Sequence, residues 1–386
     1  MYRIQTMNKI SPVGLNRFPS ELYEVGDAVQ DPQGILVRSA KLLDLEFNPS
    51  LLAIARAGVG VNNIPLDRCA AAGIPVFSTP GANANAVKEL VICAMLMGSR
   101  DIPGAIRWVR EQAASGVDVS TVVEKGKSAF IGPELYKKTL GIIGLGAIGS
   151  IVANTAISLG MDVYGYDPFL SVDTALRLDR HVHVVKDIND LYKRSDYITM
   201  HIHYTEKTAH MIDAAAMKRG VRVINLARGE IVDDEAMLTA LDTGMVAAYI
   251  TDFPNNRLLT APHVIAMPHL GASTPESEQN CAAMAVDTLR DYLESGNIRS
   301  SVNLPEMTMD RSGVQRLCVL HKNVPGMLAN ITSLFGRDGV NVENLSNKSR
   351  GDYAYTMVDL GSKVGDNVIE DVRRTANVIR VRSLEW

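Results

Sequence analysis

The sequence predicts an α/β protein with two doubly wound parallel-sheet domains and a small C-terminal domain. Three observations support this prediction. From residue 33 onward, short apolar runs alternate with helical patterns, which is typical of parallel sheets. A glycine pattern lies at a strand-to-helix turn between residues 144 and 149. After residue 313 the order changes to strand, helix, strand, strand, helix, strand. The 386 residues, 46% of them hydrophobic, can form several cores.

The first predicted domain is discontinuous and comprises residues 1–84 and 276–303. Short apolar runs bounded by turn residues predict its strands, and apolar residues at helical spacing predict its helices. The expected elements are strands at 34–40, 51–58 and 74–82, a helix at 64–73, and a returning amphipathic helix at 276–295.

The second predicted domain covers residues 85–275. A linker is expected at 304–313, after the returning segment of the first domain, and a third domain at 314–386. A long apolar helix is expected at 85–102, followed by strands at 139–144, 162–168, 182–187, 196–202, 221–227, 245–253 and 263–269. The third domain has the ferredoxin-like order, with strands at 315–322, 341–348, 353–361 and 378–384 and helices at 325–339 and 366–376.

Composition and charge exclude several classes of protein. The net charge is −4 and no long basic block occurs, so no nucleic-acid partner is expected. The longest strongly apolar run, 90–97, is too short to span a bilayer, and the N-terminus lacks a signal-peptide pattern, so no membrane partner is expected. We expect a cytoplasmic protein without a disulfide frame or metal site, because the cysteines are scattered without a CxxC pair: Cys69, Cys93, Cys281 and Cys318.

The glycine pattern is a candidate dinucleotide site. Gly144, Gly146 and Gly149 follow an apolar strand and open a helix, whose N-terminus favours phosphate. Asp167 ends the next strand, eighteen residues after Gly149, where its carboxylate can bind a ribose 2′-hydroxyl and repel a 2′-phosphate. The pattern therefore predicts a Rossmann-like domain that binds NAD rather than NADP. The alternative is a glycine-rich turn that binds nothing.

Two side chains at predicted strand ends are candidates for catalysis. Arg228 follows the strand at 221–227, and a guanidinium can bind a carboxylate through two hydrogen bonds. His269 ends the strand at 263–269, and an imidazole can accept a hydroxyl proton near neutral pH. With NAD as hydride acceptor, the pair could oxidise a 2-hydroxy acid. The alternatives are a surface ion pair for Arg228 and a structural role for His269.

Several ordered motifs resemble those of the D-isomer-specific 2-hydroxyacid dehydrogenases. "LGIIGLGAIG", "INLARGEIVDD" and "PHLGAST" are similar to that family's signatures, and "ILVRSA", "ARAGVGVNNI" and "NAVKEL" to its first domain. The resemblance implies that His269 donates and accepts the proton and that Arg228 binds the substrate carboxylate. The NAD contacts expected from the glycine pattern and the resemblance together are Gly144, Gly146, Ala147, Ile148, Gly149, Asp167, His201, Leu226, Ala227, Arg228, Asp252, His269, Gly271 and Ala272.

One segment departs from the family pattern. The family usually has a Glu that pairs with the histidine, in a segment like "DVFxxEP". Aligned on Phe253 and Pro254, that position holds Asn256 in this chain. Asp252 is either the family's cofactor-contacting Asp, shifted by one residue, or a replacement for the Glu. These alternatives remain open, so no catalytic carboxylate is assigned.

Arg38 and Arg56 each follow an apolar strand in the first domain and are suitable cations for a phosphate group. The resemblance extends to family members that oxidise 3-phospho-D-glycerate to 3-phosphohydroxypyruvate, the first step of L-serine synthesis, and implies that Ser39, Gly58 and Val59 line the same pocket. Two solvated arginines are the simpler explanation. Other open functions are a dehydrogenase for lactate, glycerate or a branched 2-hydroxy acid, and an NAD-sensing, corepressor-like binding protein.

The C-terminal domain resembles an ACT domain, a small ligand-sensing module. By this resemblance His321, Asn323 and Asn341 occupy the positions that bind L-serine in serine-regulated family members. ACT domains usually pair edge to edge, so the resemblance implies a homo-oligomer, a dimer or a tetramer. The alternative is a dimerisation module without a ligand.

Overall fold

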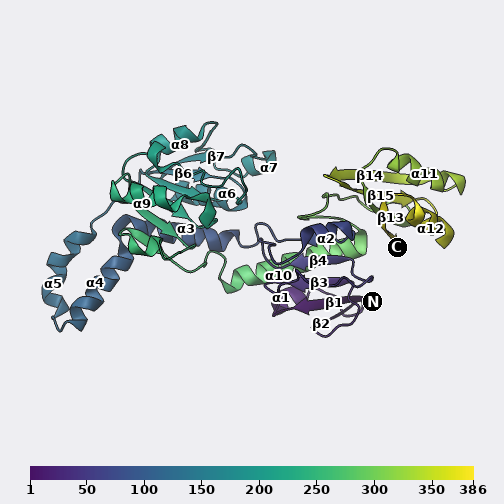
Figure 1. The fold of residues 1–386 in the computed structure, drawn as a ribbon, viewed down its shortest axis with the longest axis horizontal. Coiled ribbons are helices and arrows are strands. Elements are labelled where there is room, and N and C mark those ends of the chain that lie inside the picture. The colour runs from purple at the N-terminus through teal and green to yellow at the C-terminus, as the bar shows by residue number, and fades with distance from the viewer. The chain divides into compact units, whose positions relative to one another are not determined.

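A computed structural model describes residues 1–386 and divides into two compact units (Figure 1). Unit 1 comprises residues 1–82 and 278–386, and unit 2 comprises residues 83–277. These boundaries lie within two residues of the predicted ones at 84 and 276. The C-terminal domain belongs to unit 1, together with the first domain.

A seven-stranded parallel sheet forms the centre of unit 2, in the order β12-β11-β10-β9-β6-β7-β8. The strands are β6 (Thr139–Ile143), β7 (Asp162–Tyr166), β8 (Val182–Val185), β9 (Tyr197–Met200), β10 (Val221–Asn225), β11 (Val246–Thr251) and β12 (Val264–Ala266). All seven strands predicted between 139 and 269 are confirmed. The strand order reverses beside β6, which is where open α/β sheets bind their ligands.

Helices cover both faces of this sheet. On one face, Val91 of α3 and Val152 of α6 share a core with Ile142; on the other, Leu191 of α8 shares a core with Ile143. Successive residues of β6 thus serve opposite cores, as the pleat of a strand requires. The helical segments are α3 (Ala84–Arg100), α6 (Ala147–Ser158), α7 (Val172–Ala175), α8 (Ile188–Arg194), α9 (Asp234–Asp242), and the short turns η2 (Ala214–Ala216), η3 (Gly229–Ile231) and η4 (Leu258–Thr260).

An arm of two helices extends away from the sheet of unit 2 (Figure 1). It consists of α4 (Ile102–Ala114), α5 (Val119–Gly126) and the turn η1 (Lys127–Phe130), and none of its residues is buried. No element was expected at 103–138 from the sequence patterns. No helix of the structure has both the length and the hydropathy needed to cross a bilayer.

The first domain of unit 1 is a five-stranded parallel sheet in the order β2-β1-β3-β4-β5. Its elements are β1 (Tyr2–Met7), α1 (Pro12–Leu15), β2 (Tyr23–Gly26), β3 (Gly34–Val37), β4 (Ala53–Arg56), α2 (Leu66–Ala71), β5 (Val76–Phe77) and the long helix α10 (Pro275–Ser295). The three predicted strands and both helices are present. The first three elements lie outside the region where sequence patterns predicted structure.

The C-terminal domain is a four-stranded antiparallel sheet in the order β14-β15-β13-β16, with two helices packed on one face. Its elements are β13 (Gln315–Lys322), α11 (Met327–Arg337), β14 (Val342–Arg350), β15 (Tyr353–Leu360), α12 (Asp366–Arg374) and β16 (Val378–Glu385). The third and fourth strands flank the first, so the predicted ferredoxin-like fold is confirmed.

The other face of the C-terminal sheet packs directly on the first domain, which differs from the expected linker at 304–313. Leu304 and Met307 are buried, and Met307 forms a β-bridge with Ile298. Both belong to the same core as Leu289 of α10 and Tyr355 of β15. The segment is therefore a packed connection, because its apolar side chains are buried between the two sheets.

A fully buried ion pair lies inside this interface. The side chains of Arg316 and Asp359 are both 0% exposed, and Arg316 Nε lies 2.5 Å from Asp359 Oδ1. Arg316 Nη2 donates to Asp359 Oδ2 at 2.7 Å. The remaining guanidinium donors bind the backbone carbonyls of Ser295, Met309 and Asp310. All five N–H groups of Arg316 therefore have acceptors, which is what a buried guanidinium requires.

Asp359→Asn should destabilise the protein by about 3–5 kcal/mol, because it leaves a buried guanidinium without its counter-ion. Chemical denaturation of the full chain would measure this loss. Asp287→Asn is the matched control, since Asp287 pairs with Arg17 at the surface and such pairs are worth about 0–1 kcal/mol. Equal effects of the two substitutions would contradict the importance of the buried pair.

Candidate active site

The glycine turn between β6 and α6 has the geometry that a phosphate site needs. Gly144 has φ of +90°, and a Cβ there would lie 2.6 Å from the carbonyl oxygen of His201. A Cβ on Gly149 would lie 1.9 Å from the carbonyl oxygen of Gly144. In contrast, a Cβ on Gly146 would meet nothing within 4 Å. The first and third glycines thus allow close packing, and the second faces open space.

The N-terminus of α6 is free to bind an anion. Its N-cap residue is Gly146, and no side chain caps the helix. The N–H groups of the first turn, which have no acceptor inside a helix, begin at Ala147 and Ile148. Since these groups and the helix dipole favour phosphate, the turn fits the pyrophosphate of a dinucleotide.

Asp167 is fixed beside the same turn. Its Oδ2 accepts a hydrogen bond from the Leu145 N–H at 2.9 Å, and its Oδ1 accepts one from the Phe169 N–H at 2.9 Å. Each carboxylate oxygen retains a further lone pair for a ligand hydroxyl. The carboxylate is therefore held in place beside the glycine turn, directly after β7.

His201 follows β9 and borders the glycine turn. Its N–H donates to the Ile143 carbonyl oxygen at 2.7 Å, and its Nε2 lies 3.2 Å from Thr199 Oγ1. Part of the residue reaches solvent, but its ring lies among protein atoms, and this loss of hydration lowers the pKa of the imidazole to about 4. His201 is therefore neutral at pH 7 and adds no positive charge beside the turn.

Arg228 is positioned by an asparagine that the sequence analysis did not single out. Asn225, at the end of β10, is fully buried; its Nδ2 donates to the Arg228 carbonyl oxygen at 2.9 Å. Its Oδ1 accepts from the Ala227 N–H at 3.1 Å. This amide fixes the backbone that carries Leu226, Ala227 and Arg228. The signal in the sequence is a polar residue directly after the apolar pair Val223–Ile224, at the end of the strand.

Phe253 lies against both catalytic candidates. Its ring centre is 4.7 Å from that of His269 and 5.8 Å from the guanidinium carbon of Arg228. The Phe253 N–H donates to Thr251 Oγ1 at 3.0 Å, which fixes the turn after β11. The structure thus brings Arg228 and His269 together around one aromatic ring. In the sequence analysis Phe253 served only to align the segment.

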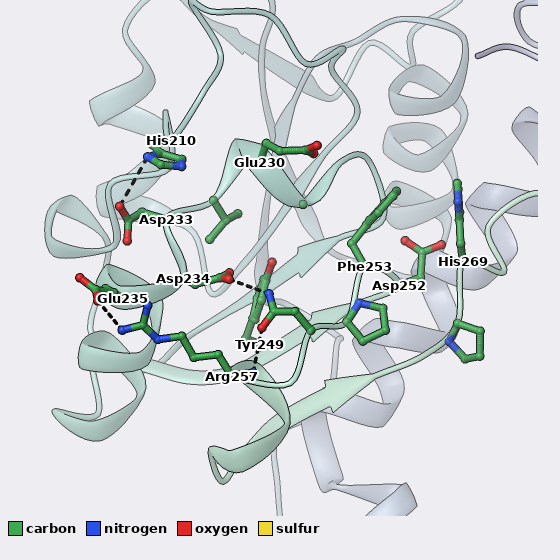
Figure 2. Close-up of a pocket in the computed structure, with 15 residues that line it drawn as sticks. His210, Glu230, Asp233, Asp234, Glu235, Tyr249, Asp252, Phe253, Arg257 and His269 are labelled. Carbon is green, nitrogen blue, oxygen red and sulfur yellow. Dashed lines mark hydrogen bonds and ion pairs between the residues drawn. The ribbon is translucent and has the colours of Figure 1, made fainter. Parts of the chain in front are cut away.

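Asp252 is buried close to His269. The residue is 1% exposed, its Oδ2 accepts from the Gly271 N–H at 3.1 Å, and its Oδ1 has no hydrogen-bond partner. Burial raises the pKa of the Asp252 carboxyl, while the Gly271 N–H and the charge of His269 oppose this rise. Figure 2 shows the carboxylate between Phe253 and His269. A buried oxygen without a partner is costly and points to a ligand or proton that completes it.

A cavity of about 810 Å³ is lined by Asp252, Phe253 and His269, whereas Arg228 is not among its lining residues (Figure 2). Besides His269, Asp252 and Phe253, its lining includes an acidic group that the sequence analysis missed: Glu230, Asp233, Asp234 and Glu235. His210 also lines the cavity, and its Nδ1 lies 3.5 Å from Oδ2 of Asp233, one of these acidic residues. Asn256 is exposed and does not line the cavity, so alignment on Phe253–Pro254 did not identify a residue beside His269.

The predicted phosphate-binding residues lie in unit 1 and are close to one another. Arg56 Nε donates to the Arg38 carbonyl oxygen at 3.0 Å. Gly58 has φ of +155°, and a Cβ there would lie 2.6 Å from Arg56 Nη1. The Ser39 N–H donates to Asn8 Oδ1 at 3.1 Å, and Val59 is half-buried nearby in sequence. Arg38 directly follows β3 and Arg56 ends β4, and these two strands are neighbours in the sheet.

The predicted serine-binding residues are only partly available. His321 is buried, with Nδ1 2.8 Å from the Lys322 carbonyl oxygen and Nε2 2.8 Å from Thr356 Oγ1. Asn323 and Asn341 are exposed, and each side chain makes one hydrogen bond within the chain: Asn323 Nδ2 donates to the Gly351 carbonyl oxygen and Asn341 Nδ2 to Glu343 Oε1. The two asparagines are therefore accessible, whereas the imidazole is already occupied within the chain.

Residues 92–271 match the family model "D-isomer specific 2-hydroxyacid dehydrogenase, NAD binding domain". The D-3-phosphoglycerate dehydrogenase of Escherichia coli strain K12 is 31% identical over 380 residues, which cover 94% of this chain and 89% of that protein. The chain belongs to the D-isomer-specific 2-hydroxyacid dehydrogenase family. The predicted family and its NAD-binding domain are confirmed, and residues 139–168 lie within the matched region.

Two further relatives extend the comparison. The D-3-phosphoglycerate dehydrogenase of Synechocystis sp. is 36% identical over 319 residues, 80% of this chain and 55% of that protein. The Methanocaldococcus jannaschii enzyme of the same name is 34% identical over 75% of this chain and 55% of its own length. The chain therefore spans little more than half the length of these two relatives.

Solved structures agree on the fold. NAD⁺-bound 3-phosphoglycerate dehydrogenase of Entamoeba histolytica superposes with a TM-score of 0.58 and 25% identity, covering 78% of this chain and 98% of that one. Apo D-mandelate dehydrogenase of Rhodotorula graminis has a TM-score of 0.66 at 20% identity, covering 81% and 99%. The predicted two-domain α/β architecture is confirmed by both.

Gly149→Ala should weaken NADH binding by roughly tenfold or more, because the new Cβ collides with the Gly144 carbonyl oxygen and displaces N–H groups whose charge-assisted bonds are worth about 1.5–3 kcal/mol. A fluorescence titration would give the Kd. The control is Gly336→Ala in α11, where a Cβ meets nothing within 4 Å. Unchanged affinity in a folded Gly149→Ala variant would argue against this turn as the cofactor site.

Proposed function

We propose that the chain is an NAD-dependent dehydrogenase that oxidises 3-phospho-D-glycerate to 3-phosphohydroxypyruvate, the first step of L-serine biosynthesis. The observation that carries this proposal is the placement of Arg228 and His269 around Phe253, in the matched NAD-binding domain. The names of the relatives support the choice of substrate. Four unpaired cysteines fit the reducing cytoplasm that we propose as its location.

Arg228 and His269 divide the recognition and the proton transfer between them. The Arg228 guanidinium binds the substrate carboxylate and thereby orients the hydroxyl-bearing carbon. His269 removes the hydroxyl proton during oxidation and returns it in the reverse direction. Bound NAD supplies the hydride acceptor. Gly144, Gly146 and Asp167, with the other predicted contacts around them, hold the cofactor.

Arg38 and Arg56 are proposed to bind the substrate phosphate. Arg38 follows β3 and Arg56 ends the neighbouring strand β4, and the Arg56 side chain donates through Nε to the Arg38 carbonyl oxygen. Ser39, Gly58 and Val59 complete this subsite. A dehydrogenase for an unphosphorylated 2-hydroxy acid has no use for two such cations, which is why we place it second. An NAD-sensing binding protein is third, since it needs neither Arg228 nor His269.

His269→Ala should lower kcat by about 10²–10⁴-fold, because it removes the general base, while NADH affinity stays within a few fold. Turnover of 3-phosphoglycerate is followed through NADH absorbance, and affinity by fluorescence. His181→Ala, an exposed histidine in unit 2, is the control. A wild-type protein that binds NADH but oxidises no 2-hydroxy acid would favour the binding-protein alternative.

Asp252 is proposed to interact both with NAD and with His269. Its position beside Gly271 supports a contact with the cofactor, and its carboxylate lies beside the proposed base. Asp252→Asn removes this neighbouring carboxylate and should therefore move the acid limb of the pH profile of oxidation to lower pH. Measuring kcat/KM from about pH 5 to about pH 9 would show this shift.

Asn256→Glu is the comparison for this experiment, because Asn256 is exposed and outside the cavity. We expect a much smaller shift from that added charge. If Asp252→Asn weakens NADH binding and leaves the profile in place, Asp252 is a cofactor ligand only. If Asn256→Glu moves the profile to higher pH, position 256, and not Asp252, lies close enough to act on His269.

A homo-oligomer is proposed to form through the helical arm of unit 2. Ile106, Val109 and Val123 are exposed on it, and a cavity of about 640 Å³ with a largely apolar lining lies between its helices. Such a surface is typical of an interface. Light scattering should give a dimer or a tetramer; a monomer at micromolar concentration would contradict the proposal.

L-serine is proposed as a ligand of the C-terminal domain. The ferredoxin-like topology and the exposed Asn323 and Asn341 support an ACT-type site. The long exposed edge strand β14 supports pairing of two such domains. A serine titration should lower the activity of the wild type and not that of Asn323→Ala. Identical responses of both proteins would remove Asn323 from the ligand site.

A further inference from the structure

Arg38 does not stand alone at the proposed phosphate subsite. Its Nη2 lies 2.5 Å from Oε1 of Glu278, in the first turns of α10, and both side chains are about half exposed, 46% and 45%. Both residues belong to unit 1, so the pair does not depend on the position of unit 2. Neither the family comparison nor the proposed reaction assigns a role to Glu278.

The surroundings make this carboxylate an internal competitor. Arg56 lies next to Arg38: its Nε donates to the Arg38 carbonyl oxygen, and its Nη1 would lie 2.6 Å from a Cβ on Gly58. Arg38, Arg56 and Glu278 thus belong to one cluster of charged side chains. A phosphate dianion that binds Arg38 must take the place of Glu278 and then lies beside a like charge, which opposes its binding.

The exposure of the pair determines how strongly it competes. Exposed ion pairs contribute little to stability, so a phosphate that accepts two parallel bonds from a guanidinium can displace the carboxylate. A competing ligand that offers only a carboxylate gains less binding free energy at Arg38, because one carboxylate then merely replaces another. Glu278 thus competes with any anion at Arg38 and weakens the binding of phosphate without preventing it.

We propose that Glu278 is a positioning residue that occupies Arg38 in the absence of substrate and so determines the affinity and selectivity of the phosphate subsite. This inference rests on the proposed function, because it takes Arg38 as a ligand of the substrate phosphate. It adds a specific acidic residue that works against substrate binding, through Arg38, without touching the reacting atoms.

Glu278→Gln should lower the KM for 3-phosphoglycerate by roughly two- to fivefold, the range typical of one exposed charge pair, and lower the Ki of inorganic phosphate by a similar factor. The KM for a 2-hydroxy acid without phosphate should change less. In Arg38→Ala, the further change Glu278→Gln should have little effect on either constant, because the carboxylate acts through that guanidinium.

Glu276→Gln is the matched control, since it removes the same charge two residues earlier on α10 from an exposed side chain. It should leave the ratio of the two KM values as in the wild type. An unchanged or higher KM for 3-phosphoglycerate in Glu278→Gln would overturn the inference, as would an equal fall for both substrates. If the wild type does not oxidise 3-phosphoglycerate at all, the proposed function fails instead, and phosphate inhibition of the remaining activity still tests Glu278.

Discussion

Parallel strand pairing is the constraint on which the candidate active site depends. In unit 2 all seven strands run in one direction, so their carboxyl ends meet at one edge of the sheet. Gly144, Asp167, His201, Arg228 and Asp252 each follow such an end closely. No single loop therefore has to carry the chemistry, because strand order alone gathers residues more than a hundred positions apart.

The parts of this site that were predictable from the sequence are those set by local backbone chemistry. Gly144 needs a positive φ and Gly149 needs close contact with the strand turn, and both requirements are visible as glycine in fixed positions. The position of Asp167 was predictable because the strand after the glycine turn and its helix ends there, as the usual length of a βαβ unit requires. The resemblance to a known family then supplied roles for Arg228 and His269, which their spacing alone left open.

The parts that were missed arise from tertiary contacts. Asn225 matters because it binds the backbone of Arg228, and Phe253 matters because its ring packs on that of His269. No local sequence pattern indicates either contact. Asn256 is exposed and does not line the cavity, which an alignment on two residues does not reveal, because it carries no information about where a side chain faces. The segment 304–313 was predicted to be a linker, yet its apolar residues Leu304, Met307 and Met309 belong to a core that includes residues of both sheets of unit 1.

The last turn of α10 links the C-terminal domain to the rest of unit 1. Arg382 of β16 donates to the carbonyl oxygens of Tyr292 and Leu293, and Arg316 of β13 donates to that of Ser295. A helix end otherwise leaves such acceptors to water. A chain truncated after residue 303 would leave these carbonyl oxygens without their arginine donors and would expose the apolar residues that the C-terminal sheet buries. Exchanging the domain between homologues therefore requires transferring both sides of the junction.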